Sequence, residues 1–377
     1  APFTFTYTDG TTPVTVTAHP TASYTITNAP AGNYSVTALT DANSCAATSL
    51  GGTANVVVNP LPTATIAGGG PVCAGSQLPN VTFTFTGTAP FTFTYNNGGA
   101  PVTVTNHPST VFTINNAPAG TYTVTALTDA NTCIATNLGT PVSVTVNTLP
   151  TATATGGGTI CIGGTLPNVT FNFTGTQPFN FTYTDGTTPV TITGHTSNSY
   201  TITGATAGAY RVTALTDANG CAATNFGATA NVVVNPLPTA TISGGGAVCV
   251  GSPLPNVTFT FTGTAPYTFT YNNGGAPVTV TNHPSNSFVI ANAAVGTYTI
   301  TALTDANTCI GTSFGTPVAV STNALPTASL VGGGTVCTGA TLPNVTFNFT
   351  GTAPFNFTYN NGGAPITVTN HLTNSFT

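Results

Sequence analysis

Electrical charge is the first property that this sequence has little of. Its 377 residues include six acidic residues and one basic residue, Arg211, and Glu, Lys, Met and Trp do not occur. Proteins that bind nucleic acids or anionic membranes neutralise phosphate groups with many Lys and Arg side chains. A single cation cannot build such a surface, so we expect no nucleic-acid partner and no insertion of this segment into a membrane.

The scarcity of acids and the lack of Glu and Lys also remove the usual catalytic groups. General acid–base and nucleophilic catalysis need paired carboxylates, or a base beside a hydroxyl or thiol. The six acids are scattered along the chain at Asp9, Asp41, Asp129, Asp185, Asp217 and Asp305. We therefore expect that the protein is not an enzyme and has no catalytic residues, no cofactor and no cofactor-binding residues.

What the chain does have is a regular pattern of aromatic residues. Low charge often accompanies disorder, but disordered segments are also poor in aromatic residues, and this chain has 22 Phe and 12 Tyr. In the stretch from Val81 to Thr86, apolar and hydroxyl side chains alternate, and the alternation resumes from Phe91 to Tyr95. Alternate residues of an extended strand share one face. The pattern therefore predicts two half-buried strands.

The same pattern recurs along the chain at a constant interval. The motif Leu-Pro-Thr-Ala begins at Leu61, Leu149, Leu237 and Leu325, which indicates a repeat of 88 residues. Because Ala1 aligns with Ala89 and no start methionine, signal peptide or hydrophobic span is present, the chain is interpreted as a segment of a longer protein. The predicted organisation is a partial repeat at 1–60 (its C-terminal part), whole repeats at 61–148, 149–236 and 237–324, and a partial repeat at 325–377 (its N-terminal part).

Within one repeat the sequence predicts seven or eight short strands and no helix. Gly68–Gly70 allows the backbone to bend or to change sheets, and Asn97-Gly98 favours a hairpin with a primed turn and a return strand from Val102. This spacing of strands and turns is typical of an antiparallel sandwich. The connector Val146–Pro150 is short and contains proline, so successive sandwiches should form a semi-rigid rod.

The cysteines follow the repeat as well. They are Cys45, Cys73, Cys133, Cys161, Cys221, Cys249, Cys309 and Cys337, with spacings that alternate between 28 and 60 residues. No spacing suits a zinc site, whereas disulfides are expected and would place the protein outside the cytoplasm. Two pairings compete, Cys73 with Cys133 inside a repeat and Cys45 with Cys73 between repeats.

The pairing inside a repeat is preferred, since the segment before the Phe-rich strands can lie beside the last strand of its own sandwich. The predicted disulfides are then Cys73–Cys133, Cys161–Cys221 and Cys249–Cys309. Cys45 and Cys337 would find partners outside the segment or in a neighbouring subunit.

Three motifs together resemble a known class of repeat. They are Gly-Gly-Gly-x-x-Cys-x-Gly at Gly68–Gly75, Pro-Phe-x-Phe-x-Tyr at Pro90–Tyr95, and the stretch from Ala119 to Cys133. The chain is similar to the immunoglobulin-like or PKD-like repeats of giant bacterial surface proteins, above all the SprB-type gliding-motility adhesins. The resemblance implies an all-β tandem array of immunoglobulin-like sandwiches that is exported to the cell surface and has a structural or adhesive role.

The turn Thr-Asp-Ala-Asn is a weak candidate for calcium. One carboxylate in each turn is few beside a true calcium loop, and an Asx turn ahead of the cysteine explains the motif without metal. We therefore predict no metal site, with Asp129, Asn131, Asp217, Asn219, Asp305 and Asn307 as the weak calcium candidates. The histidines His19, His107, His195, His283 and His371 share one repeat position without other ligands, so we expect them to pack beside a turn.

The acceptor sequence Asn-Val-Thr occurs once in each repeat and allows N-glycosylation. The residues concerned are Asn80, Asn168, Asn256 and Asn344. Three functional hypotheses remain open. The first is a structural segment of a giant extracellular or cell-surface fibre, with copies of itself or a continuation of the same chain as its partner. The others are an adhesive array that binds glycans or surfaces, and a filament or sheath whose subunits complete one another by exchanging strands.

Overall fold

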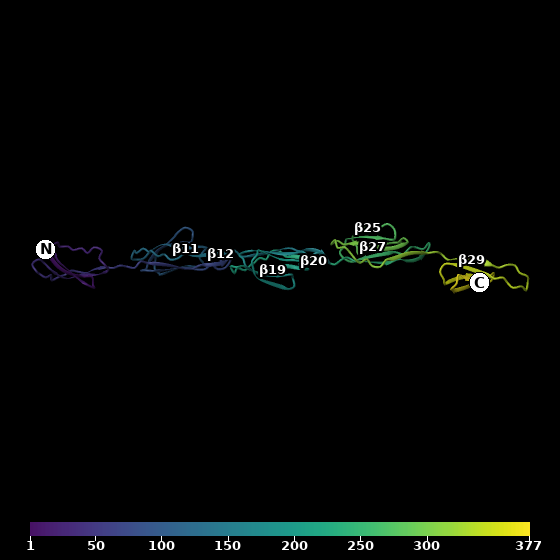
Figure 1. The fold of residues 1–377 in the computed structure, drawn as a ribbon, viewed down its shortest axis with the longest axis horizontal. Coiled ribbons are helices and arrows are strands. Elements are labelled where there is room, and N and C mark those ends of the chain that lie inside the picture. Colours follow the sequence, from purple (N-terminus) through teal and green to yellow (C-terminus); the bar gives the residue numbers. More distant parts are fainter.

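The protein is a row of β-sheet groups with its two termini toward opposite ends (Figure 1). The computed structural model describes residues 1–377, and every regular element in it is a β-strand. The chain has no helix, and therefore none with the length and apolarity to cross a membrane. The all-β architecture expected from the alternating pattern is confirmed.

The group that follows residue 60 shows how a sandwich is built, and we call it the first sandwich. Its strands are β5 (Thr63–Gly68), β6 (Gly70–Cys73), β7 (Val81–Thr86), β8 (Phe91–Asn96), β9 (Val102–His107), β10 (Val111–Ile114), β11 (Gly120–Thr128) and β12 (Val142–Asn147). A three-stranded sheet has the order β10-β7-β5, and a five-stranded sheet has the order β6-β12-β11-β8-β9.

The core lies between these two sheets and is formed by the alternate residues that the sequence pattern indicates. Phe83 and Phe85 of β7 and Phe91 and Phe93 of β8 are all buried, and the rings of Phe85 and Phe93 are 4.6 Å apart between centroids. Threonines fill the outer faces and bond in cross-strand pairs, such as Thr63 with Thr86 at 2.7 Å. The sandwich therefore has a dry aromatic core and a hydroxyl surface.

Two further groups have the same two sheets. The second sandwich consists of β13 (Thr151–Gly156), β14 (Gly158–Cys161), β15 (Val169–Thr174), β16 (Phe179–Thr184), β17 (Pro189–His195), β18 (Ser199–Ile202), β19 (Gly208–Thr216) and β20 (Ala230–Asn235). The third consists of β21 (Ala240–Gly244), β22 (Gly246–Cys249), β23 (Val257–Phe261), β24 (Tyr267–Asn272), β25 (Val278–His283), β26 (Ser287–Ile290), β27 (Gly296–Thr304) and β28 (Val318–Asn323).

The groups at the two ends of the row contain fewer strands. The N-terminal group is one four-stranded sheet of order β2-β1-β3-β4, made of β1 (Phe3–Thr8), β2 (Pro13–His19), β3 (Gly32–Thr40) and β4 (Ala54–Val56). The C-terminal group has the sheets β29-β30-β33 and β31-β32, made of β29 (Thr327–Gly332), β30 (Val345–Thr350), β31 (Phe355–Tyr359), β32 (Ile366–His371) and β33 (Ser375–Phe376). One apolar face of the N-terminal sheet is therefore left without a facing sheet.

The glycine run ahead of β6 changes sheets, as its composition suggests. β5 pairs with β7 in the three-stranded sheet, whereas β6 pairs with β12 in the five-stranded sheet. Gly68 and Gly69 have φ angles of 90° and 72°, which only glycine adopts readily. A Cβ on Gly69 would also lie 2.8 Å from the carbonyl oxygen of Ser143, so the crossing depends on the absence of side chains.

The predicted hairpin after β8 forms, but its loop is longer than a two-residue turn. β8 ends at Asn96 and β9 begins at Val102, and Gly98 has a φ of 95° whereas Asn97 is not left-handed. In the corresponding loop of the N-terminal group, Asp9 Oδ1 accepts hydrogen bonds from the backbone N–H groups of Thr11 and Thr12. These side-chain bonds hold a wider loop, so the prediction of a primed turn was wrong.

A tyrosine anchors the start of the long strand in each sandwich. The hydroxyl of Tyr122 donates to the carbonyl oxygen of Pro118 at 2.8 Å, and Tyr210 and Tyr298 make the equivalent bonds to Thr206 and Ala294. A tyrosine that bonds back to the backbone a few residues upstream is a feature of immunoglobulin-like sandwiches. These three equivalent hydrogen bonds therefore support the immunoglobulin-like fold.

Candidate functional site

The feature that differs most from the sequence prediction is the joint between consecutive sandwiches. One half of the first joint is the end of β6, which runs parallel to β12 so that Cys73 lies opposite Asn147. The N–H of Ala74 donates to the carbonyl oxygen of Asn147 at 2.8 Å, and a tight turn at Gly75 follows. Cys73 is thereby held at the end of the first sandwich from which the chain passes to the second.

The other half of the joint is the turn that follows β19 in the second sandwich. Asp217 is buried, and its Oδ1 accepts hydrogen bonds from the backbone N–H groups of Asn219 and Cys221 at 3.0 and 3.1 Å. Its Oδ2 accepts a third bond from the N–H of Thr176 at 3.2 Å. This is the Asx turn that the sequence suggests, and it fixes the backbone of the cysteine.

The turn lies where the chain enters the second sandwich. β12 ends at Asn147 and β13 begins at Thr151, so only three residues connect the two sandwiches. A Cβ on Gly175 would lie 2.9 Å from Cβ of Pro150 and 3.3 Å from Oδ2 of Asp217. The connector, Gly175 and the aspartate turn are therefore packed together at the entry end of the sandwich.

The two halves are joined by a disulfide between sandwiches. Cys73 is bonded to Cys221 and Cys161 is bonded to Cys309, each across 148 residues with a Cα–Cα distance of 5.5 Å. Cys221 and Cys309 are fully buried. The joint between the first and second sandwiches and the joint between the second and third thus each have two covalent links, a connector of three or four residues and the disulfide.

These bonds correct the predicted pairings Cys73–Cys133, Cys161–Cys221 and Cys249–Cys309, and the alternative Cys45–Cys73 is not formed either. The segment that carries Cys73 does lie beside the last strand of its own sandwich, as the prediction assumed. It runs parallel to that strand, however, and so delivers the cysteine to the exit end. Cys133 follows β11, which is antiparallel to β12, and therefore lies at the entry end.

Four cysteines have no partner in the chain. Cys45, Cys249 and Cys337 are exposed, and Cys133 is partly exposed. Cys249 repeats the exit geometry, because β22 pairs with β28 and Cys249 lies opposite Asn323. Cys133 repeats the entry geometry, because Asp129 Oδ1 accepts from the N–H groups of Asn131 and Cys133, both at 3.0 Å. Cys249 and Cys133 therefore have the same local geometry as the bonded cysteines at the exit and entry ends of a sandwich.

The weak calcium candidates fall within the aspartate turns. In each of the three turns around Asp129, Asp217 and Asp305, both carboxylate oxygens accept backbone hydrogen bonds, and the amide nitrogens of Asn131, Asn219 and Asn307 donate to Thr88, Thr176 and Thr264. No group of three or more His, Cys, Asp or Glu side chains is arranged to hold a metal ion. The motif therefore has a complete structural role as a turn.

The histidines lie beside turns and stabilise them. His107 Nε2 is 3.0 Å from the carbonyl oxygen of Val111, and its ring lies edge-on to Phe112 with centroids 5.5 Å apart. The equivalent bond is present for His19, His195, His283 and His371. A nitrogen this close to a carbonyl oxygen carries the proton and donates it.

The acceptor asparagines are exposed at the start of the Phe-rich strands. Asn80 Oδ1 accepts from the N–H of Asn116 at 3.0 Å, and Asn168 and Asn256 make the same bond to Gly204 and Asn292. This bond uses the side-chain oxygen and does not involve the amide nitrogen, where a glycan would attach. N-glycosylation at Asn80, Asn168, Asn256 and Asn344 stays a prediction.

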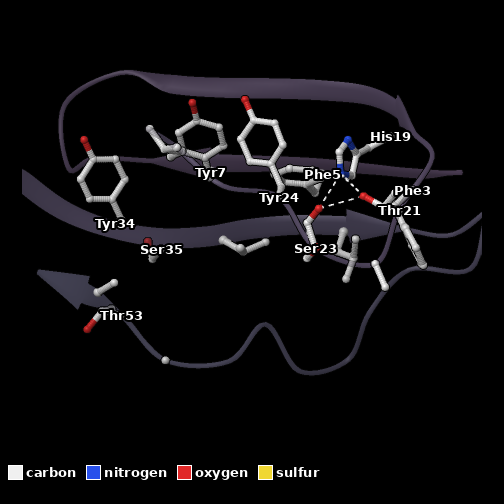
Figure 2. Close-up of a pocket in the computed structure, with 16 residues that line it drawn as sticks. Phe3, Phe5, Tyr7, His19, Thr21, Ser23, Tyr24, Tyr34, Ser35 and Thr53 are labelled. Carbon is white, nitrogen blue, oxygen red and sulfur yellow. Dashed lines mark hydrogen bonds between the residues drawn. The ribbon is translucent and has the colours of Figure 1, made fainter. Parts of the chain in front are cut away.

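The N-terminal sheet has a groove of about 620 Å³ on its uncovered apolar face. Figure 2 shows the rings of Phe5, Tyr7, Tyr24 and Tyr34 along this groove, with His19 bonded to Thr21 and Ser23 at one end. The residues in the same repeat positions of the first sandwich, Phe93 and Tyr95 among them, pack against Phe83 and Phe85 of β7. Sequence reasoning placed a partial repeat here but did not identify the groove.

The geometry defines the class of this protein, which is a tandem array of immunoglobulin-like β-sandwiches with disulfides between neighbouring sandwiches. No family model and no curated protein matches the chain. Solved structures of tandem immunoglobulin domains are similar to it in fold. An I-band fragment of titin is 13% identical, with a TM-score of 0.42, and the match covers 69% of this chain and 100% of the fragment.

Two surface proteins are similar at the same level. A bacterial ice-binding adhesin is 13% identical with a TM-score of 0.32, covering 70% of this chain and 99% of its own. The ectodomain of mouse nectin-like molecule 4 is 11% identical with a TM-score of 0.34, covering 60% and 81%. At these identities the similarity concerns the fold alone.

Proposed function

We propose that this chain is a segment of the shaft of an extracellular fibre, in which disulfides between neighbouring sandwiches limit bending and extension. The observation that carries the proposal is the pair of bonds Cys73–Cys221 and Cys161–Cys309, each of which crosses a joint. The repeats 61–148, 149–236 and 237–324 are the units of this shaft, and the segments 1–60 and 325–377 are parts of further units.

A joint with two covalent links is stiffer than one with a connector alone. The connector lies at Thr148–Pro150, and the disulfide forms a second link beside it. Two separated links prevent the swing and the rotation that a single flexible connector allows. The linear arrangement of the sandwiches in Figure 1 is consistent with a rod.

The composition fits a structural role in an oxidising environment. Stable disulfides are found in extracellular and surface proteins. The outer faces carry threonine pairs in place of ions.

The disulfides shorten the covalent path through the chain. With both bonds intact, the shortest path runs from Cys73 to Cys221, back along the backbone to Cys161, and on through the second bond to Cys309. Residues 74–160 and 222–308 are outside this path. They cannot lengthen the chain under tension, even when their sandwiches unfold.

Stretching of single molecules by their two ends tests the proposal. At about 3.5 Å for each extended residue, the oxidised chain should reach a final length about 600 Å shorter than the reduced chain. The control is the variant Cys73→Ser/Cys161→Ser, which should reach the reduced length without any reductant. Equal final lengths for the oxidised and reduced parent chain would refute the shaft proposal.

A further inference from the structure

We propose that the hairpin loops that carry Asn97 and Asn273 are sites of self-modification, at which water converts the asparagine to aspartate or isoaspartate with release of ammonia. In isoaspartate the backbone runs through the side-chain carbon. The reaction needs only the chain's own atoms and water. The inference goes beyond the role of a shaft and does not depend on it. Its consequence is a surface that gains negative charge after the chain has folded.

The two asparagines occupy a repeat position at which the chain carries either of two residues. Asp9 and Asp185 hold this position in the N-terminal group and the second sandwich, and Asn97 and Asn273 hold it in the first and third sandwiches. Asn361 holds it in the C-terminal group. A glycine follows at every one of these positions, so each loop has the pair Asp-Gly or Asn-Gly.

The glycine is what makes the asparagine reactive. In the first step the backbone nitrogen of Gly98 attacks Cγ of Asn97, so this nitrogen has to approach the side chain closely. Glycine has no Cβ to obstruct the approach, and asparagine is one of the thermolabile residues of proteins. Gly98 and Gly274 are both exposed, and a Cβ on either would meet no atom within 4 Å. The loops therefore have room to rearrange during the reaction.

The bonds balance with water as the reactant consumed. Hydroxide takes the N–H proton of Gly98, the bond from this nitrogen to Cγ of Asn97 forms, and the Cγ–Nδ2 bond breaks. The departing NH₂ group takes a proton from water, which releases ammonia and restores the hydroxide. Water then opens the cyclic imide. Cleavage between the nitrogen and Cγ gives aspartate, and cleavage between the nitrogen and the backbone carbonyl carbon gives isoaspartate.

Hydrogen bonds hold the reacting groups of the first hairpin only loosely. The side chain of Asn97 accepts a single bond, from the N–H of Gly99 at 3.4 Å, and the attacking N–H of Gly98 donates to Asn96 Oδ1 at 3.3 Å. The third sandwich repeats the second of these bonds, also at 3.3 Å. Such distances exceed the usual range for N–H···O bonds. The nucleophile and the side chain can therefore turn toward each other.

The second sandwich already contains the product of the reaction at this position. Asp185 Oδ1 accepts hydrogen bonds from the hydroxyl and the N–H of Thr187 at 2.7 and 2.9 Å, and from the N–H of Thr188 at 3.2 Å. The Thr187 hydroxyl, and then the two N–H groups, lower the pKa of Asp185 below its ordinary value of 3.8. A carboxylate at this position is therefore compatible with the fold and is well solvated by its loop.

A further Asn-Gly pair lies in the turn at the first joint and provides an internal comparison. Asn219 and Gly220 are exposed as well, so exposure does not separate the two kinds of site. The N–H of Gly220 donates to the carbonyl oxygen of Asp217 at 3.0 Å, and Asn219 Nδ2 donates to Thr176 Oγ1 at 2.9 Å. Because the attacking nitrogen and the departing amide are both bonded, the turn protects Asn219.

Conversion changes the surface of the protein because exposed charges are few. Three of the six acids are buried in turns. Conversion of Asn97, Asn273 and Asn361 takes the formal net charge from −5 to −8, one unit for each residue. Net charge keeps proteins soluble and apart from one another. A carboxylate at this hairpin in every repeat would therefore oppose lateral association of the rods.

The test follows the amides of the folded chain. The free thiols are alkylated, and the chain is kept in warm, mildly alkaline buffer below its melting transition. Pepsin digestion at acidic pH and mass spectrometry, with separation of aspartate from isoaspartate peptides, follow the reaction. We expect Asn97 and Asn273 to give both products, and Asn219 to react more than about 10-fold more slowly, since its reaction waits for local opening of the turn. Equal rates at Asn97 and Asn219 overturn the proposal.

The reduced chain in urea shows whether the fold or the local sequence sets these rates. Without the turn, Asn219 should react as fast as Asn97 and Asn273, because all three precede glycine. If Asn219 stays slow in urea, the hydrogen bonds of the turn do not protect it. If Asn97 and Asn273 react in urea but keep their amides in the folded chain, the hairpins are not sites of modification.

Two matched variants examine the first hairpin. Asn97→Gln keeps an amide but adds a methylene group that disfavours ring closure, so it should suppress conversion in this loop and leave Asn273 unchanged. Asn97→Asp supplies the product, and its first sandwich should melt no lower than that of the parent. A clear drop in melting temperature would contradict the equivalence with Asp185. The same digest reports the disulfides Cys73–Cys221 and Cys161–Cys309, so failure of this proposal is distinguishable from failure of the shaft.

Discussion

At the scale of single residues, the buried aspartate organises each joint. Asp217 accepts three backbone hydrogen bonds and orients Cys221, and Asp305 does the same for Cys309. A buried carboxylate needs such donors, since water cannot solvate it. Three of the six acids in the chain are buried turn residues of this kind, and two of them, Asp217 and Asp305, hold a cysteine that is bonded to the neighbouring sandwich.

The first prediction concerns this aspartate. Asp217→Ala leaves three backbone N–H groups without their acceptor, and we expect the melting transition of the second sandwich to lose about 3 kcal/mol of stability. Calorimetry of the parent and the variant measures this loss. Formation of Cys73–Cys221 in a redox buffer should also slow.

The matched control is Asp129→Ala, which removes the same bonds from a turn whose Cys133 is free. It should destabilise the first sandwich by a similar amount and leave the formation of Cys73–Cys221 unchanged. If both variants slow the bond equally, the aspartate does not act by orienting its own cysteine.

The second prediction concerns Tyr183, a partly buried tyrosine that packs against the core of the second sandwich. Loss of solvation on burial, and the nearby Tyr200, raise the pKa of Tyr183 above its ordinary value of 10.0. The folded state then keeps a proton that the unfolded state releases, so this contribution to stability is complete below about pH 10 and declines as the pH rises through the folded pKa.

Urea unfolding between pH 9 and pH 11.5, with the free thiols alkylated, measures the decline. Those limits are chosen to bracket the ordinary tyrosine pKa of about 10. Tyr183→Phe keeps the ring beside Phe171 and removes the titrating hydroxyl. The variant should lose less stability than the parent over this range, and an identical decline would show that Tyr183 does not contribute.

At the scale of elements, the strands could be predicted from the sequence because one rule governs them. Alternation of Phe with Thr can place only one set of side chains inside, so Val81, Phe83 and Phe85 are buried as expected. Gly68–Gly70 could be identified as a place where the chain changes sheets. The eight strands of one sandwich and its antiparallel pairs follow from these patterns.

The disulfides could not be predicted, because they depend on the direction in which β6 runs along β12, and the sequence indicates only that the two strands are neighbours. The sequence indicates that β6 lies beside β12 but does not state whether it runs parallel or antiparallel. Parallel pairing moves Cys73 from one end of the sandwich to the other, and with it the identity of the partner. The loops that Cys45–Cys73 and Cys73–Cys133 would close, of 28 and 60 residues, also differ too little in closure entropy to decide between these two pairings.

The third prediction concerns the crossing segment before β6. Gly69→Ala and Gly70→Ala both place a side chain at positive φ, at 72° and 113°, but only Gly69 faces a backbone oxygen at 2.8 Å. We expect Gly69→Ala to destabilise the first sandwich by about 1–2 kcal/mol more than Gly70→Ala. Calorimetry measures the difference, and equal losses would contradict the close approach of β6 to β12.

At the scale of the whole molecule, the bonds overlap along the chain. Cys161 lies between Cys73 and Cys221 in sequence, so the two disulfides interlock and the second sandwich takes part in both. The two joints among the first, second and third sandwiches thus each have a covalent link beside the backbone. When a sandwich unfolds, only those of its residues that lie on the shortest covalent path, such as 161–221, can lengthen the rod.

The central claim is that disulfides connect neighbouring sandwiches and not the two ends of one sandwich. Pepsin digestion of the oxidised chain at acidic pH, followed by mass spectrometry of the linked peptides, tests it most directly. Peptides that join Cys73 to Cys221 and Cys161 to Cys309 are the predicted result. Peptides that join Cys73 to Cys133 and Cys161 to Cys221 would contradict it.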